Sequence, residues 1–327
     1  MFIYDFQKVS KDIVTVSLAL FRIMIPTIII VKIAQEMGAD DLLVALFAPL
    51  MSAMDLPASM AIVLVTTLLT NPYAGIIVAT SVAEIANLTV GQMSIVALFM
   101  LFTHGLPLEA MVSRRVGVQL WFIVSLRVLT AFLSGILLAK IFAITGWYSA
   151  PAPVNLLQLS GLQTGDASLG AWVMAQIGAI LAIQLVIIVL VAGLELLRLL
   201  GVERFMTWLL RPVLRVMGIG DRASTIAIVG VTLGLSFGSG LLMKDVATGT
   251  ICKRDVFGVV CFVNLIHSVI EDTAIVLILG PSLFVILFVR LVISVLITML
   301  VMAGARLLPD HLWQVYLTNH HIPKSAG

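Results

Sequence analysis

Long runs of apolar residues dominate the chain, and short polar clusters separate them. Six runs are long enough to cross a bilayer as a helix, which takes about 20 residues. They cover residues 14–34, 91–112, 118–142, 171–197, 254–275 and 282–306. Two further apolar stretches, 57–87 and 221–250, are interrupted near their centres. The pattern predicts an all-α polytopic membrane protein.

The two interruptions are clusters of helix-breaking residues. The later one lies in Thr232–Thr250, where Gly234, Gly238 and Gly240 break an apolar run, and the earlier one is Asn71–Gly75, NPYAG. Backbone polar groups freed at membrane depth are tolerated only where they line a protein cavity. The breaks therefore indicate a binding site. The alternative is that glycine and proline merely allow helices to pack closely.

The second half of the chain repeats the first at a constant spacing of 163 residues, which is the distance from Gly38 to Gly201. The informative matches are the residue types that are rare here. They are Pro49 with Pro212, His104 with His267, Arg127 with Arg290 and, with the carboxylate kept, Glu109 with Asp272. The sequence predicts repeats at 17–144 and 171–307, with an N-terminal segment 1–16, a loop 145–170 and a tail 308–327.

Charge distinguishes the two repeats. Residues 33–56 carry four carboxylates and no Lys or Arg, whereas the matching region carries five arginines between Arg198 and Arg222. Cytoplasmic flanks collect Lys and Arg. The same element then lies outside in repeat one and inside in repeat two, which is the inverted-repeat architecture of secondary transporters.

The broken stretches fit re-entrant helical hairpins. Each arm has about 14 residues, too few to cross alone. The exit of the first stretch carries no positive charge, whereas the exit of the second carries Lys253 and Arg254, so each exit matches its own entry side. The alternative, a single kinked spanning helix, would place Arg114 and Arg115 outside, against the charge rule.

The remaining segments complete the predicted topology. Lys8 and Lys11 place the N-terminus in the cytoplasm, residues 40–55 and 200–218 form interfacial helices, and 145–170 is an external loop. The tail, with His311, His320 and His321, is expected to be solvated and cytoplasmic. We expect a multi-pass protein of a bacterial cytoplasmic (inner) membrane.

Composition excludes most other classes. Hydrophobic residues make up 61% of the 327 residues and charged ones 11%, against about 25% in a soluble domain. The two cysteines show no ligand spacing, and no HExxH, GxSxG or paired-Asp motif is present. We therefore expect no enzyme activity, no metal, no cofactor and no nucleic-acid partner.

The hairpin tips are the first candidate site. A tip at mid-membrane presents helix N–H groups to an anion and unwound carbonyls to a cation. The tip residues are Asn71, Tyr73 and Gly75 in repeat one and Ser236, Gly238 and Ser239 in repeat two. Lys244 and Asp245 face apolar or small counterparts in the other repeat, so they are candidates for distinguishing a substrate.

Ionisable residues in the spans are the second candidate site. His104, Arg127, His267 and Arg290 fall near the predicted midplane, where such groups are costly and tend to be paired or functional. Glu109 and Asp272 stand five residues after the histidines. A histidine titrates near neutral pH and can carry a coupling proton. The alternative is that arginine–carboxylate bonds only hold neighbouring helices together.

Two stretches resemble the nucleoside-recognition or Gate domain family, which includes spore maturation proteins A and B and the membrane region of ferrous-iron transporter B. They are Gly193–Gly218, GLELLRLLGVERFMTWLLRPVLRVMG, and Gly234–Gly240, GLSFGSG. In repeat one, Ala34–Met54 is similar to the first of these stretches, whereas Asn71–Gly75 differs from the second. The resemblance implies membrane transport or permeation and names no solute.

These observations predict a transporter or permease for a small polar, anionic solute, bound between two hairpin tips and exposed to each side in turn. Arg127, Arg290 and Lys244 would hold the anion. His104, Glu109, His267 and Asp272 would handle a coupling H⁺ or Na⁺. A homo-oligomer is compatible with this reading. The alternative function is a non-transporting membrane subunit that docks a partner through the arginine-rich helix 200–218.

The inverted topology predicts that Asp41 and Arg204 face opposite sides of the membrane. Single cysteines at these positions, in a chain whose Cys252 and Cys261 are replaced by serine, should react with a membrane-impermeant maleimide from opposite sides. Labelling of both from one side would falsify the inverted repeat.

Overall fold

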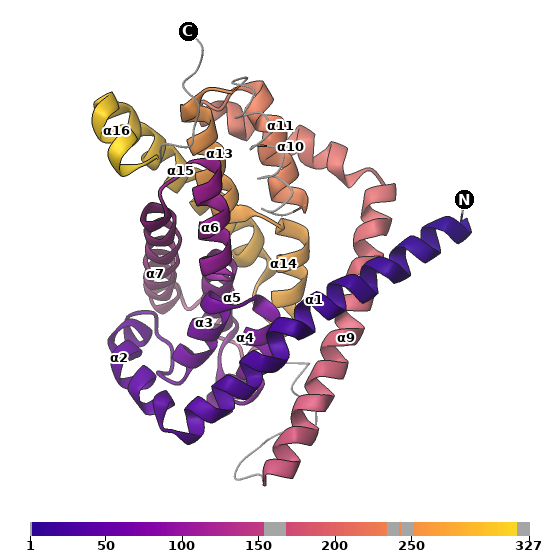
Figure 1. The fold of residues 1–327 in the computed structure, drawn as a ribbon. Coiled ribbons are helices and arrows are strands. Elements are labelled where there is room, and N and C mark those ends of the chain that lie inside the picture. The colour runs from indigo at the N-terminus through magenta and orange to yellow at the C-terminus, as the bar shows by residue number, and fades with distance from the viewer. Residues whose placement is uncertain (1, 154–167, 234–241, 243–250, 319–327) are drawn as a thin grey trace. The chain divides into compact units, whose positions relative to one another are not determined.

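The structure is a computed structural model, and it describes residues 2–153, 168–233, 242 and 251–318. Every regular element in these ranges is a helix, and the only β-type pairs among them are isolated bridges (Figure 1). The prediction of an all-α membrane protein is confirmed, because six helices are long and apolar enough to span a bilayer.

The described elements follow one another in the order of Figure 1. In the first half they are α1 (Phe2–Glu36), α2 (Ala39–Ala53), α3 (Met60–Leu69), α4 (Pro72–Thr80), the 3₁₀ turn η1 (Ala83–Asn87), α5 (Val90–Thr103), α6 (Leu106–Val116) and α7 (Leu120–Thr145). In the second half they are α9 (Leu169–Leu199), α10 (Val202–Val216), α11 (Asp221–Leu233), α13 (Lys253–Ile266), α14 (Val269–Val276), η2 (Leu277–Leu279), the π-helical η3 (Phe284–Val289), α15 (Arg290–Leu307) and α16 (Asp310–Tyr316).

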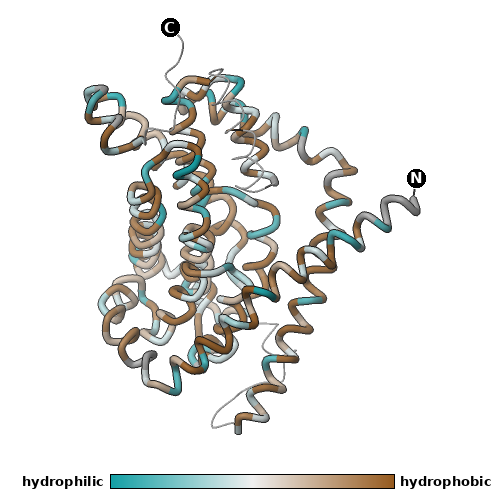
Figure 2. The backbone as a smooth tube through the Cα atoms, in the orientation of Figure 1, coloured by the Kyte–Doolittle hydropathy of each residue, from teal (hydrophilic) through white to brown (hydrophobic). Residues whose placement is uncertain are grey.

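The six candidate spans agree with the six predicted crossings. They are Val9–Glu36, Val90–Val116, Leu120–Thr145, Leu169–Leu197, Lys253–Leu279 and Phe284–Leu307. Apolar residues run along most of α1 and α9 in Figure 2, with few polar positions between them. Few large side chains of either helix are buried, as is typical of helices whose surroundings are lipid.

The chain divides into two compact units that each combine segments from both predicted repeats. Unit 1 consists of Met1–His104, Gly135–Leu200 and Glu271–Ile286. Unit 2 consists of Gly105–Ser134, Gly201–Ile270 and Leu287–Gly327. The predicted repeat boundaries therefore do not coincide with compact units.

Local structure recurs at the spacing of 163 residues. Helices α2 and α10 begin and end at matching positions, and so do α5 and α13. Gly38 and Gly201 precede α2 and α10 with the same left-handed φ of 75°. Thr89 and Cys252 both cap the N-terminus of the helix that follows them. The orientation of one copy relative to the other stays a prediction.

The first broken stretch folds as a helical hairpin inside unit 1. The Asn71 side chain accepts a hydrogen bond from the Ala74 N–H at 2.9 Å and so caps α4, whose first residue is Pro72. Helix α4 turns back and packs on α3. A Cβ added to Gly75 would lie 1.8 Å from the Thr67 hydroxyl, so the two helices meet at a distance that only glycine allows.

Two of the spanning segments are interrupted, which the sequence analysis did not predict. Helix α5 ends before His104, and Gly105 takes a left-handed φ of 60° before α6 begins. Pro107, in the first turn of α6, fits a new helix start and not a helix interior. The same break separates α13 from α14, where Ser268 has a φ of 45°. Each break directly follows a histidine.

The described start of the tail is folded, although the sequence analysis expected a solvated tail. In unit 2 the Trp313 ring of α16 lies 4.8 Å from the Phe257 ring, edge to face. The Gln119 N–H donates to the Leu317 carbonyl at 3.0 Å. Trp313 anchors the segment because burying an aromatic side chain removes a large apolar area from water. His320 and His321 lie outside the described residues.

The contact at Gly75 predicts a selective sensitivity to one methyl group. Gly75→Ala should lower the free energy of unfolding by about 1–3 kcal/mol, because the added carbon forces α3 and α4 apart. The measurement is the thermal midpoint of the purified protein in detergent. Thr67→Ala should restore part of the loss, because it removes the obstructing hydroxyl.

Gly193→Ala is the matched control, since an added Cβ on this α9 residue meets nothing within 4 Å. Its midpoint should stay the same or rise slightly with helix propensity. Equal midpoints for the Gly75 and Gly193 variants would contradict the close-packed hairpin.

Candidate functional site

The two histidines are held in the same way at the ends of two helices. His104 Nδ1 lies 3.0 Å from the Met100 carbonyl oxygen, and His267 Nδ1 lies 3.1 Å from the Val263 carbonyl oxygen. In each case the acceptor is the carbonyl four residues earlier in the same helix. The ring is thereby fixed to its own helix, and its other nitrogen, Nε2, is directed to a partner elsewhere in the fold.

In unit 1 the partner of His104 is Asp272. Nε2 lies 3.3 Å from the Asp272 Oδ2 atom, and the two residues are 5% and 7% exposed. The preceding residue of α14, Glu271, accepts a hydrogen bond from the hydroxyl of Tyr73, which is buried in the first turn of α4. A hairpin tip, a helix end and a helix start therefore bring four titratable groups together.

In unit 2 the partner of His267 is Glu109. Nε2 lies 2.9 Å from the Glu109 Oε1 atom, and the Oε2 atom of the same carboxylate forms an ion pair with Arg127. Arg127 is 0% exposed. One carboxylate thus joins a histidine at the end of α13 to an arginine of α7.

Arg290 donates hydrogen bonds to backbone carbonyls at the C-terminal end of α13. Its Nε donates to the Leu265 carbonyl at 3.2 Å, and its Nη2 donates to the His267 carbonyl at 3.4 Å. The last carbonyls of a helix lack partners within the helix. A fully buried arginine therefore stabilises the C-terminus of α13 next to the histidine.

Each histidine pairs with a carboxylate of the other repeat. Glu109 and Asp272 each follow the histidine of their own repeat by five residues, yet His104 contacts Asp272 and His267 contacts Glu109. This pairing between repeats agrees with the composition of the units, because each unit contains the histidine of one repeat and the carboxylate of the other. The two pairs occupy matching positions in the sequence.

The predicted site residues divide into three groups. Tyr73, His104 and Asp272 come together in unit 1, and Glu109, Arg127, His267 and Arg290 come together in unit 2. Asn71 and Gly75 shape the hairpin tip, and the Asn71 Nδ2 atom has no hydrogen-bond partner among the described residues. Ser236, Gly238, Ser239, Lys244 and Asp245 lie outside the described residues.

Arg127 makes the arginine–carboxylate contact that the structural alternative predicts, whereas the contacts described for Arg290 are to backbone carbonyls. Arg127 bonds to Glu109 and Arg290 to backbone carbonyls of α13, and both side chains are fully buried. Their charges are directed at protein groups. The sequence analysis also considered these arginines as holders of a substrate anion, and that role stays a prediction.

Sequence reasoning missed Glu271. Its counterpart in repeat one is Leu108, so a search for matched residues passes over it. The signal was a second carboxylate beside Asp272 within an apolar segment, where an acidic side chain needs a partner. The Tyr73 hydroxyl supplies that partner from a helix almost 200 residues earlier.

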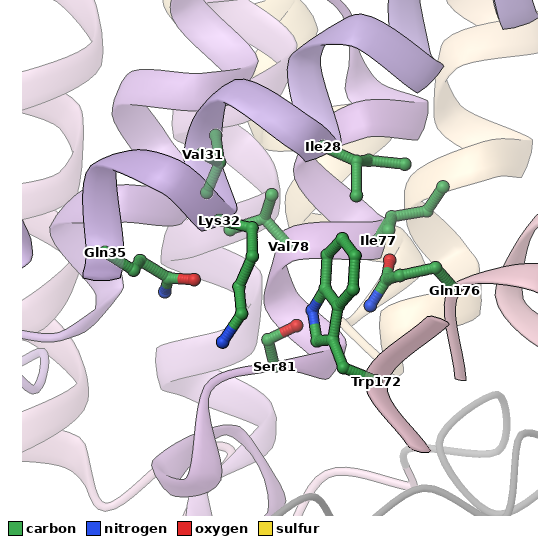
Figure 3. A pocket seen from close by; sticks show the side chains of 9 residues that line it. All are labelled: Ile28, Val31, Lys32, Gln35, Ile77, Val78, Ser81, Trp172 and Gln176. Carbon is green, nitrogen blue, oxygen red and sulfur yellow. The ribbon is translucent and has the colours of Figure 1, made fainter. Parts of the chain in front are cut away.

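A separate small pocket in unit 1 lies between α1, α4 and α9 (Figure 3). Its polar lining comes from Lys32, Gln35, Ser81 and Gln176. The Lys32 ammonium pairs with Glu36 at 2.6 Å and lies 5.8 Å from the centre of the Trp172 ring. The pocket shares no lining residue with the histidine–carboxylate pairs.

Fold and site together define a multi-pass, all-helical membrane protein with buried histidine–carboxylate pairs. The chain is 29% identical over 287 residues to the uncharacterized membrane protein YvoD of Bacillus subtilis (strain 168). The match covers 85% of this chain and 88% of that protein. No family model matches the chain, and no solved structure matches it.

The buried ion pair predicts that Arg127→Met is strongly destabilising. Removing one partner of a buried pair leaves the other charge uncompensated and costs about 3–5 kcal/mol. The thermal midpoint in detergent should fall accordingly. The double variant Arg127→Met/Glu109→Gln should fall less, because it leaves no unbalanced charge.

Arg115→Met is the control, since this arginine of α6 is exposed. Its midpoint should match that of the unmodified protein. An Arg127→Met variant as stable as the control would show that the ion pair does not hold the helices together, and would favour the substrate-binding role for Arg127.

Proposed function

We propose that the protein is a secondary transporter or permease for a small polar solute in a bacterial cytoplasmic membrane. The observation that supports this proposal is the pair of buried histidine–carboxylate contacts at matching positions of the two repeats. Ionisable groups inside membrane spans are costly and mark substrate or ion pathways. Helix packing alone requires no titratable group at these positions.

The arrangement of the chain supports alternating access as the mechanism. Inverted repeats of secondary transporters move relative to each other around a site at their interface. The chain passes between unit 1 and unit 2 five times, and the first passage lies between His104 and Gly105. This first passage coincides with the helix break at Gly105, and broken helices can absorb the backbone rotation that a hinge requires.

The solute site of this proposal lies at the hairpin tips. In unit 1 the tip offers the Asn71 amide and the Tyr73 hydroxyl beside the start of α4. The sequence also predicts tip residues of repeat two and Lys244 as solute ligands, which lie outside the described residues, and a positive Lys244 would favour an anionic solute. The Gate-like stretches agree with a role in permeation. Both termini lie in the cytoplasm in this proposal.

A second candidate function is a membrane subunit that supports a partner protein without transporting. Helix α10 favours it, because Phe205 and Trp208 are exposed on a helix that also carries several arginines. The same features suit a helix that lies at the lipid interface. The histidine–carboxylate pairs have no role in the second function, so we prefer transport.

The proposal predicts solute-dependent flux in proteoliposomes. Purified protein should produce transient currents on a solid-supported membrane when organic acids, nucleosides or amino acids are applied as concentration jumps. His104→Gln and His267→Gln should each reduce the current at least tenfold, because each disrupts one ion-coupling pair.

The matched control is His311→Gln, since His311 is exposed on α16 and lies outside both pairs. It should leave the current unchanged. Protein that moves no solute in the screen but co-purifies with a fixed partner would overturn the transport proposal in favour of the subunit.

A further inference from the structure

We infer that the two histidine–carboxylate pairs are proton-binding sites, each holding one exchangeable proton between a ring nitrogen and a carboxylate oxygen. If the protein is a transporter, as proposed above, the inference names H⁺ rather than Na⁺ as its coupling ion. The claim that each pair binds a proton does not depend on transport and rests on hydrogen-bond geometry alone.

The inference follows from the number of N–H groups on each imidazole ring and the acceptors that surround it. A carbonyl oxygen only accepts hydrogen bonds, so the nitrogen 3.0 Å from the Met100 oxygen must donate. A neutral imidazole has a single N–H, and in His104 the bond to Met100 uses it. Nε2 would then present a lone pair to the Asp272 oxygen 3.3 Å away. Two acceptors at this distance repel, and one further proton turns the contact into a hydrogen bond.

The second pair repeats the argument at shorter range. His267 Nδ1 lies 3.1 Å from the Val263 oxygen, and Nε2 lies 2.9 Å from Glu109 Oε1. The other neutral tautomer, with hydrogen on Nε2, would place a lone pair against a carbonyl oxygen in both copies. One added proton in each pair satisfies all four contacts, as imidazolium with carboxylate or as imidazole with carboxylic acid.

The charged groups around each pair are compatible with a bound proton. His104 faces Asp272 of α14, with Glu271 on the same helix and the Tyr73 hydroxyl of α4 bonded to Glu271. The Asp272 carboxylate can therefore balance an imidazolium at His104.

The surroundings of the second pair differ in sign. His267 faces Glu109 of α6, which also pairs with Arg127 of α7, while Arg290 of α15 bonds to the His267 backbone. One carboxylate therefore serves two cationic partners when His267 is protonated. The two proton sites are thus matched in position but different in charge.

The geometry disfavours sodium at the pairs. Hard cations take oxygen ligands, whereas each pair offers an imidazole nitrogen and a carboxylate. The 2.9 Å separation in the second pair is that of a direct hydrogen bond, and the 3.3 Å separation in the first pair lies just beyond the usual range.

Proton loss would couple to movement of the helices. A pair without its proton sets a lone pair against a buried carboxylate, so deprotonation favours separation of the two side chains. Each histidine ends its helix directly before a break, at Gly105 or Ser268, where the backbone can turn. Release of the proton and rotation at the break are therefore linked.

The test is ¹⁵N NMR of histidine-labelled, full-length protein in lipid nanodiscs, with the proton as ligand. His104→Gln and His267→Gln assign two of the five histidines. At neutral pH each assigned ring should carry hydrogen on Nδ1 and share a second proton through Nε2. Raising the pH should convert each to the neutral Nδ1–H form. A neutral Nε2–H tautomer for both rings over the whole pH range would overturn the inference.

Variants of the carboxylates test which one shares a proton with each histidine. Asp272→Asn should remove the shared proton from His104 alone, and Glu109→Gln should remove it from His267 alone, because an amide N–H can donate to the bare Nε2. Glu84→Gln, at an exposed carboxylate of η1, should leave both signals unchanged. Equal effects of all three variants would contradict specific proton sites.

Solute currents measured under opposing gradients separate the two proposals. Currents that follow the pH gradient and ignore the Na⁺ gradient support proton coupling. Currents that follow Na⁺ alone overturn the coupling ion and leave transport standing. Shared protons in the NMR spectra with no current in any solute screen would overturn transport and leave the proton sites standing.

Discussion

The bond between a buried histidine and a buried carboxylate is the interaction on which this structure depends. An ionisable side chain inside apolar helices needs a partner, and within its own helix each of His104 and His267 contacts a backbone carbonyl through Nδ1. Asp272 and Glu109 satisfy them from helices far away in sequence. Each unit must therefore combine segments of both repeats.

The helix breaks follow from the same requirement. A straight helix would carry His104 and the residues after it in one direction, whereas the left-handed Gly105 lets α6 start anew after the histidine. Ser268 takes a similar conformation between α13 and α14, where it is strained for a residue with a side chain. Strained backbone of this kind gathers at functional sites, which agrees with a role for His267.

Transport and simple helix fixation make different demands on these residues. Arg127 and Arg290 behave as fixation requires, because their donors meet a carboxylate and helix-end carbonyls. The histidines do more than fixation requires, since each contact needs a proton that the surroundings can add or remove. Under the proposed function, one network would hold the helices together and also bind the coupling proton.

The sequence by itself determined the membrane class, the six candidate spans and the helix–break–helix hairpin at Asn71–Gly75, because hydrophobic run length and rare residue types are local signals. Asn71 and Pro72 predict the start of α4, because the Asn71 side chain caps the helix at Ala74 and Pro72 is its first residue. Only the tertiary structure decided which carboxylate each histidine meets, and it added Glu271 as the partner of Tyr73. Pairing across some 160 residues depends on how helices pack, and a spacing of five residues along one segment carries no information about that contact.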